Sequence, residues 1–178
     1  MKQDTLEARP REQKAEAIEA FEKQTGYDAS YMKEMLAQAP EALDVFNAFI
    51  PMANHRKRAP LLAYHVAKLT AYRHCDCGPC FQLALDYARQ QGVPLAIREA
   101  IAFGKGELPM DLQRVRDFAL AALRNDPELE ELRQTVERKL GKAAVIELAL
   151  AIAAPQIFPV VKRAMGHYKS CSMVTLSA

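Results

Sequence analysis

The stretch PLLAYHVAKLTAYRHCDCGPC, residues 60–80, decides the fold class. Its first eleven residues space apolar and polar side chains as on an amphipathic helix, and three cysteines follow within six residues. No segment of the chain alternates apolar and polar residues as a half-buried strand does. The sequence therefore predicts an all-α protein whose cysteines lie between helices.

Prolines and glycines along the rest of the chain fall where helices should begin and end. We expect helices over residues 11–24, 29–38, 41–53, 60–72, 78–91, 94–103, 127–140, 142–154 and 155–165. One more is expected around the apolar stripe Leu112, Val115, Phe118, Ala119, Ala122 and Leu123. We predict one domain, residues 1–178, with a core over about 40–166, helices 11–38 packed on it and a flexible tail over 168–178.

Composition and charge exclude several classes of protein. Half of the 178 residues are hydrophobic and 26% are charged, which suits a chain with a buried core and not a disordered one. Lysine plus arginine (24) nearly balances aspartate plus glutamate (22), so no nucleic-acid partner is expected. The N-terminus has no apolar signal core, and the apolar run 143–154 ends at Pro155, short of a membrane span of roughly 20 residues. We therefore expect a cytoplasmic protein without a membrane partner.

Two charged features have an ordinary explanation and a functional one. The cluster His55-Arg56-Lys57-Arg58 could hold an anion, but four basic residues without interleaved aromatics are more typical of a solvated connector. Glu147 stands alone in an apolar segment and needs a partner if it is buried. We expect a structural ion pair there rather than a catalytic carboxylate.

Cys77 and Cys80 are the candidate catalytic residues. They lie three residues apart at the predicted start of helix 78–91, where they share one face and can reach disulfide geometry. Asp76 is the predicted N-cap, and Pro79 suits a first helical turn. Unpaired N–H groups at a helix N-terminus favour a thiolate, so the spacing predicts a redox-active pair.

Two other uses of the cysteines stay open at this point. His74, Cys75, Cys77 and Cys80, or Cys171 in place of the histidine, could supply four ligands to zinc, although structural sites usually draw ligands from two separated pairs. The pair could also be inert on an interaction or redox-sensor protein. We expect no metal and no other cofactor, and we expect Cys75 and Cys171 to be spectators.

The tetrapeptide Cys77-Gly78-Pro79-Cys80 is also the active-site sequence of thioredoxins, but there it follows a β-strand, whereas a helix precedes it here. The stretch from Pro60 to Gly106 instead resembles the AhpD-like, carboxymuconolactone decarboxylase superfamily. In it a helix leads into the dithiol, then Gln91-Gly92-Val93-Pro94, then a helix ending near Gly104. A weaker likeness extends to Thr25-Gly26-Tyr27 and to the apolar helix near the C-terminus.

The resemblance implies an AhpD-like helical bundle with alkylhydroperoxidase-like chemistry. By matching, Cys80 takes the hydroperoxide and becomes a sulfenic acid, and Cys77 resolves it to a disulfide. The implied partners are a small hydroperoxide or disulfide substrate and a dithiol or a second protein as reductant. Members of this superfamily are usually oligomers, so a homo-oligomer is also implied.

The chain departs from the family at the proton relay. A glutamate twelve residues before the first cysteine and histidines beside and after the second are replaced by His65, Pro79 and Ala84. His65 is the only titratable residue left at these positions, and we predict that it acts as the base. The decarboxylase activity in the family's name is a weaker expectation, because no other acid-base group accompanies the dithiol.

Overall fold

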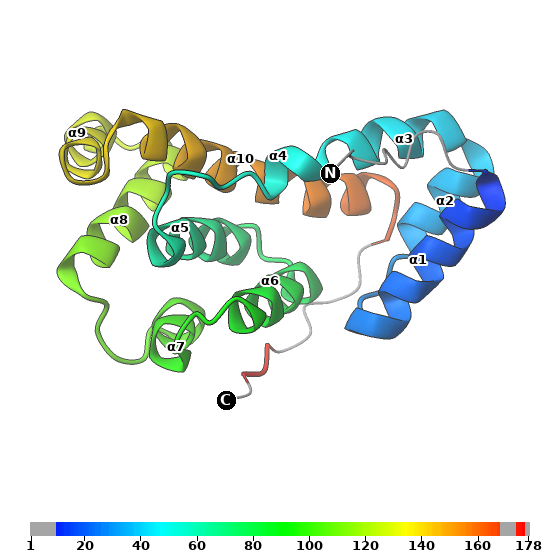
Figure 1. Ribbon diagram of the computed structural model, residues 1–178, viewed down its shortest axis with the longest axis horizontal. Helices are drawn as coiled ribbons and strands as arrows, with labels where there is room; N and C mark the ends of the chain where they lie inside the picture. Colours follow the sequence, from blue (N-terminus) through cyan, green and yellow to red (C-terminus); the bar gives the residue numbers. More distant parts are fainter. Residues whose placement is uncertain (1–9, 168–173, 177–178) are drawn as a thin grey trace.

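All regular secondary structure in residues 10–167 and 174–176, the part that the computed structural model describes, is helical (Figure 1). The helices are α1 (Arg11–Thr25), α2 (Ser30–Gln38), α3 (Pro40–Ala48), α4 (Ile50–Ala53), α5 (Leu61–His74), α6 (Gly78–Gln90), α7 (Leu95–Phe103), α8 (Met110–Arg124), α9 (Leu129–Leu140) and α10 (Lys142–Ala164). The all-α prediction is confirmed, and the chain forms one compact domain. Of the predicted tail, residues 168–173, with Cys171, and residues 177–178 lie outside the described part.

Prolines explain two differences between the predicted and the observed helices. The helix predicted over 41–53 is divided into α3 and α4 around Phe49. Pro51 has no N–H to donate to the carbonyl four residues earlier, so the helix cannot continue unchanged. The predicted break at Pro155 is wrong, because α10 continues through Pro155 and Pro159 as one helix of 23 residues.

Tertiary packing and the Cys75 thiol explain why α10 continues through its two prolines. Pro155 and Pro159 are fully buried, so tertiary contacts hold both rings in place. Pro159 cannot donate to the Pro155 carbonyl, which would otherwise be left without a hydrogen bond. The Cys75 thiol donates to that carbonyl at 3.6 Å. Cys75 therefore has a structural role at this point of α10.

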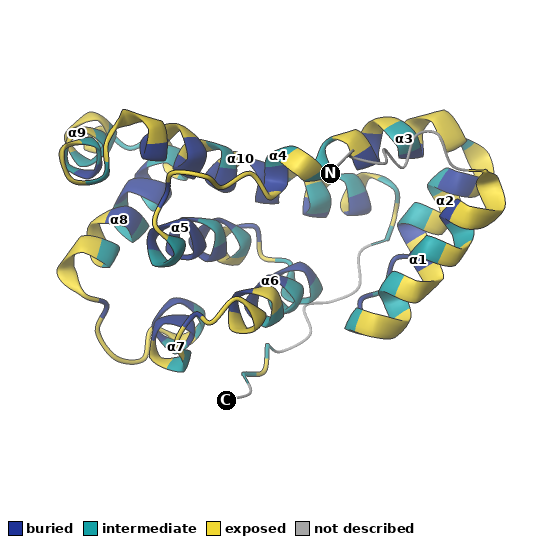
Figure 2. Cartoon of the chain, in the orientation of Figure 1, coloured by how far each residue is buried: buried dark blue, intermediate teal, exposed yellow. Residues whose placement is uncertain are grey.

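α10 is the spine of the molecule and α5 is its centre. In Figure 1 α10 runs from the side that holds α8 and α9 toward the side that holds α1, α2 and α3. α5 lies along it and is the most buried helix in Figure 2, with Val66, Ala67 and Leu69 completely enclosed. By length and composition α10 could cross a membrane, but half of its most apolar part is buried within the domain, as in a core helix. The dithiol helix α6 packs against the buried helix α5.

A second apolar cluster joins the N-terminal helices to the dithiol. Ile18, Tyr27, Tyr31, Leu43 and Phe46 pack together, and the buried Cys80 belongs to the same cluster. The chain turns into the cluster at Gly26, which ends α1 at φ 68°, a conformation that favours glycine. That turn aims Tyr27 back at α6.

Glu147 binds the basic connector before α5. Its carboxylate accepts backbone hydrogen bonds of 2.8–3.0 Å from Lys57, Arg58 and Ala59, and His55 Nε2 lies 3.8 Å away. Burial raises the pKa of this carboxyl, but the backbone donors outweigh burial, and the pKa lies below its ordinary value. Backbone amides are thus its main partners, and His55 forms the predicted ion pair with it when the ring is protonated. The connector is held to α10, while its side chains at 55–58 stay exposed.

Candidate active site

The two cysteines of the motif meet at the N-terminus of α6. Cys77, and not the predicted Asp76, is the N-cap residue, and Asp76 takes the left-handed conformation, φ 50°, in the short turn after α5. Asp tolerates this conformation better than most residues, and the turn brings the first thiol onto the helix end. The Cys77 and Cys80 sulfur atoms lie 2.7 Å apart as free thiols that share a hydrogen bond.

The two thiols of the pair differ in acidity. The hydrogen bond with Cys80 lowers the pKa of the Cys77 thiol most; burial opposes this, while backbone N–H donation and the charges of Lys162 and Arg163 add to the lowering. The same hydrogen bond, together with burial, raises the pKa of Cys80. At neutral pH the pair therefore carries one proton, mainly on Cys80, and one negative charge, mainly on Cys77.

The two sulfurs face different surroundings. Cys77 is half-buried, whereas Cys80 is only 3% exposed and lies against Tyr27, whose hydroxyl oxygen is 3.4 Å from the Cys80 sulfur. Tyr27 packs edge-on against Tyr31 and at a tilted angle against Phe21, so its ring is held on two sides. Burial raises the pKa of Tyr27, which keeps this hydroxyl protonated and able to donate to a thiolate.

Lys162 brings a buried positive charge to the same place. Its ammonium lies 4.5 Å from the centre of the Tyr27 ring and 5.4 Å from that of Tyr31, and its side chain is nearly enclosed. Cation–π contact holds it there, and its charge lowers the pKa of both thiols. Lys162 thus favours the anionic form of the dithiol.

Replacing Lys162 by methionine is expected to raise the pKa of Cys77, because a charge that stabilises the thiolate is lost while the buried volume is kept. The pH dependence of alkylation by iodoacetamide, followed by mass spectrometry at Cys77, measures this. The midpoint should move upward from the wild-type value toward that of a free thiol, about 8.5. Lys142→Met, at the exposed far end of α10, is the matched control and should leave the midpoint in place. An unchanged midpoint in Lys162→Met would show that Lys162 does not act on the pair.

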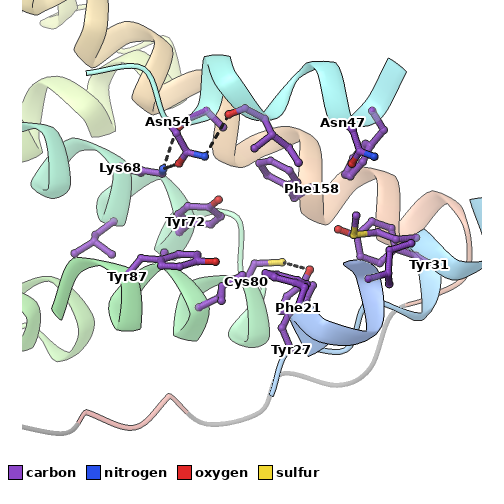
Figure 3. A pocket seen from close by; sticks show the side chains of 18 of the residues that line it. Phe21, Tyr27, Tyr31, Asn47, Asn54, Lys68, Tyr72, Cys80, Tyr87 and Phe158 are labelled. Atoms are coloured by element: carbon purple, nitrogen blue, oxygen red, sulfur yellow. Dashed lines mark hydrogen bonds between the residues drawn. The ribbon is translucent and has the colours of Figure 1, made fainter. Parts of the chain in front are cut away.

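Cys80 lies on the wall of a cavity of about 670 Å³ (Figure 3). The walls come from α1 to α6 and from Phe158 of α10, and five of the chain's six tyrosines line them. In the view of Figure 3, Lys68 and Tyr87 lie on one side of Cys80 and Tyr31 on the other. This volume suits a small organic molecule, and the walls are mostly apolar and aromatic. A substrate in the cavity can therefore touch the Cys80 sulfur.

His65 lines the same cavity without contacting the dithiol. Its Nε2 pairs with Gln91 Oε1 at 3.0 Å, and its ring packs against Tyr64. Burial lowers the pKa of His65; the Gln91 hydrogen bond opposes burial, and the nearby charges of Lys68 and Arg56 lower the pKa further. His65 is thus a neutral residue of the wall, and its predicted role as the base is not supported by a hydrogen bond to sulfur.

The candidate zinc ligands point to different partners. Cys75 is bonded to the Pro155 carbonyl, burial raises the pKa of its thiol to about 11, and the side chain of His74 is exposed. Among the residues that the structure describes, no three His, Cys, Asp or Glu side chains are grouped to hold a metal ion. Cys171 lies outside those residues, so its place in the alternative ligand set is not described.

Three residues of the site were not singled out from the sequence. Tyr27 stood within the weaker likeness at residues 25–27, and the helix-ending glycine before it was the available signal. Lys162 and Lys68 carried no signal, because each is one lysine in an amphipathic helix whose neighbours are known only from the packing. Their contacts join the turn after α1 to α6 and α10, and α5 to α4.

The chain matches no protein-family model, no curated protein and no solved structure. The AhpD-like resemblance therefore remains a prediction from residues 60–106, and a proposal of function must depend on the geometry of the site.

Proposed function

We propose that this protein is a thiol oxidoreductase of the alkylhydroperoxidase kind, which reduces organic hydroperoxides with the Cys77–Cys80 dithiol. One observation carries the proposal. The Cys80 sulfur lies 2.7 Å from a second thiol and also lines a cavity of about 670 Å³, so one sulfur can meet both a substrate and its resolving partner.

The first step is attack on the hydroperoxide by Cys80. The proton of the pair lies mainly on Cys80, and its transfer to the Cys77 thiolate across their hydrogen bond gives the Cys80 thiolate, the minor form that reacts. The Cys80 thiolate then attacks the outer oxygen of the hydroperoxide, the O–O bond breaks, and an alkoxide leaves, which takes a proton from solvent to give the alcohol. Cys80 becomes a sulfenic acid.

The second step closes the disulfide. The Cys77 sulfur attacks the sulfenic sulfur, the S–O bond breaks, and water is released. In total the pair, which begins with one proton, loses two electrons and that proton. The hydroperoxide gains both electrons and, with one further proton from solvent, becomes an alcohol and water. An external dithiol or a reductant protein then exchanges with the disulfide, and the half-exposed Cys77 is the sulfur that it can reach.

Tyr27 and Lys162 take over part of what the family's relay would do. The Tyr27 hydroxyl can donate to the Cys80 thiolate and to the oxygen that develops charge as the O–O bond breaks. Lys162, over the Tyr27 ring, stabilises the negative charge of the pair. Neither residue needs to exchange a proton with the dithiol, so the missing glutamate and histidines do not prevent the reaction.

Intact mass and hydroperoxide consumption test the proposal. The reduced protein is treated with one equivalent of cumene hydroperoxide, and its mass should fall by two hydrogen atoms as one equivalent of cumyl alcohol forms. With excess dithiothreitol the consumption should become catalytic. An unchanged mass with full thiol content, or a disulfide that forms without consumption of the hydroperoxide, would contradict the proposed reaction.

A further inference from the structure

The polar end of the cavity is lined by cationic side chains and, among the described residues, by no carboxylate. The cations among the lining residues are Lys14, Arg56 and Lys68, and none of the described residues that line the cavity is aspartate or glutamate. Lys14 forms an ion pair with Asp44 and is neutralised. Arg56 and Lys68 therefore give this end of the cavity a net positive charge.

Among the described residues, the hydrogen-bond acceptors of Lys68 and Arg56 are all neutral oxygen atoms. The Lys68 ammonium donates to the Ala53 carbonyl at 2.7 Å and to Asn54 Oδ1 at 2.9 Å. Arg56 donates to the Ala59 carbonyl at 3.1 Å. Burial lowers the pKa of Lys68 to about 8, as expected for an enclosed ammonium without a counter-ion. An anion that entered the cavity would supply the missing charge.

The charged end is also the open end. Asn54, Arg56, Tyr87 and Gln91 are exposed where they line the cavity, whereas Cys80 is buried at the other end of the same face of α6. Gln91 follows Cys80 by eleven residues, or about 16 Å along a helix. His65 pairs with Gln91, and Lys68 lies one turn further along α5 toward Cys80. The cavity thus runs from a cationic mouth, along aromatic walls, to a thiol.

We propose that the substrate of this site is an amphipathic carboxylate, a fatty-acid hydroperoxide whose carboxylate is held by Lys68 and Arg56 while its hydroperoxide lies at Cys80. The substrate class rests on the proposed hydroperoxide reduction, but the carboxylate site does not depend on it. Alkyl chains gain by leaving water for the aromatic walls. A charged hydrogen bond at the mouth fixes which end of the molecule enters first.

Binding of unreactive ligands tests the carboxylate site apart from the redox chemistry. Decanoate and 1-decanol, which share a chain and differ in charge, are titrated into the reduced protein by calorimetry. Tyrosine emission gives a second readout, because the chain has no tryptophan and five of its six tyrosines line the cavity. Decanoate should bind roughly tenfold or more tightly than decanol, which is the range of a hydrogen bond to a charged group.

Lys68→Met should remove most of the preference for decanoate, and Arg56→Gln should reduce it, while Lys23→Met, on the exposed side of α1, is the matched control. Lys68→Arg should restore the preference, because the charge returns. Equal binding of decanoate and decanol by the wild-type protein would overturn the proposal, as would a preference that survives in the Lys68→Met and Arg56→Gln double variant.

Kinetics then separates this inference from the proposed function. The ratio of kcat/KM for linoleic acid hydroperoxide to that for its methyl ester should exceed one in the wild-type protein and fall toward one in Lys68→Met. Reduction of both substrates at equal rates would support the peroxidase function and overturn the carboxylate inference. Selective decanoate binding without any hydroperoxide consumption would support the carboxylate site and overturn the peroxidase function.

Discussion

Replacing Cys77 by serine is expected to leave one oxygen atom on Cys80 after treatment with one equivalent of hydroperoxide. Cys80 lines the cavity and can still be oxidised, although more slowly because the Cys77 thiolate no longer accepts its proton. Its resolving partner, 2.7 Å away in the wild-type protein, is also gone. The sulfenic acid should be visible as one added oxygen in the intact mass and should be trapped by dimedone. Turnover with dithiothreitol should fall steeply, because the fast intramolecular step is lost.

Cys80→Ser is expected to gain no oxygen under the same treatment, since the remaining Cys77 does not line the cavity. Cys75→Ser is the matched control, a buried cysteine two residues before the pair, and it should still form the disulfide. The opposite pattern, an inert Cys77→Ser and an oxidised Cys80→Ser, would show that Cys77 is the sulfur attacked. Far-UV circular dichroism of each variant checks that the helices are intact.

Replacing Glu147 by alanine is expected to lower the free energy of unfolding by about 3 kcal/mol or more. The change leaves the backbone N–H groups of Lys57, Arg58 and Ala59 without their carboxylate acceptor, and that of Ala59 is buried. Urea denaturation followed by circular dichroism measures the loss. Glu107→Ala, in the exposed loop before α8, is the control and should change stability by no more than about 0.5 kcal/mol. Similar values for the two variants would contradict the role of Glu147.

Acid should abolish the stabilisation that the Glu147 carboxylate gives to the folded protein. The pKa of Glu147 is lower in the folded protein than in the unfolded one, so its contribution is complete above the unfolded value of about 4.3 and is lost as the pH falls through the folded value. The stability gap between the wild-type protein and Glu147→Gln should therefore be constant near neutral pH and shrink below about pH 4. A gap that stays constant into acid would show that the charge of Glu147 does not stabilise the fold.

The sequence was sufficient for the features that depend on neighbouring residues. Apolar spacing, prolines and glycines identified the helices, because a helix is fixed largely by residues three and four positions apart. The same local logic placed Cys77 and Cys80 on one turn at a helix start, and the structure has them in contact there. Asp76 as the N-cap was wrong by one residue, since a left-handed turn cannot be deduced from the residue type alone.

Features that join distant elements could only come from the tertiary structure. The continuation of α10 through Pro155 could not be predicted from local sequence, since it depends on burial and on a thiol 80 residues earlier. His65 was predicted as the base, and the structure places it on the cavity wall with Gln91 as its hydrogen-bond partner.

The sequence by itself determined an all-α chain with a dithiol at a helix N-terminus, because both follow from local periodicity. The packing of α1, α5, α6 and α10 decided the surroundings of that dithiol: the Tyr27 hydroxyl, the Lys162 charge and a cavity with Lys68 at its mouth. These surroundings set the acidity of each thiol and the molecules that can reach it. Side chains that meet across an interior are chosen by the whole fold, and no short stretch of sequence specifies them.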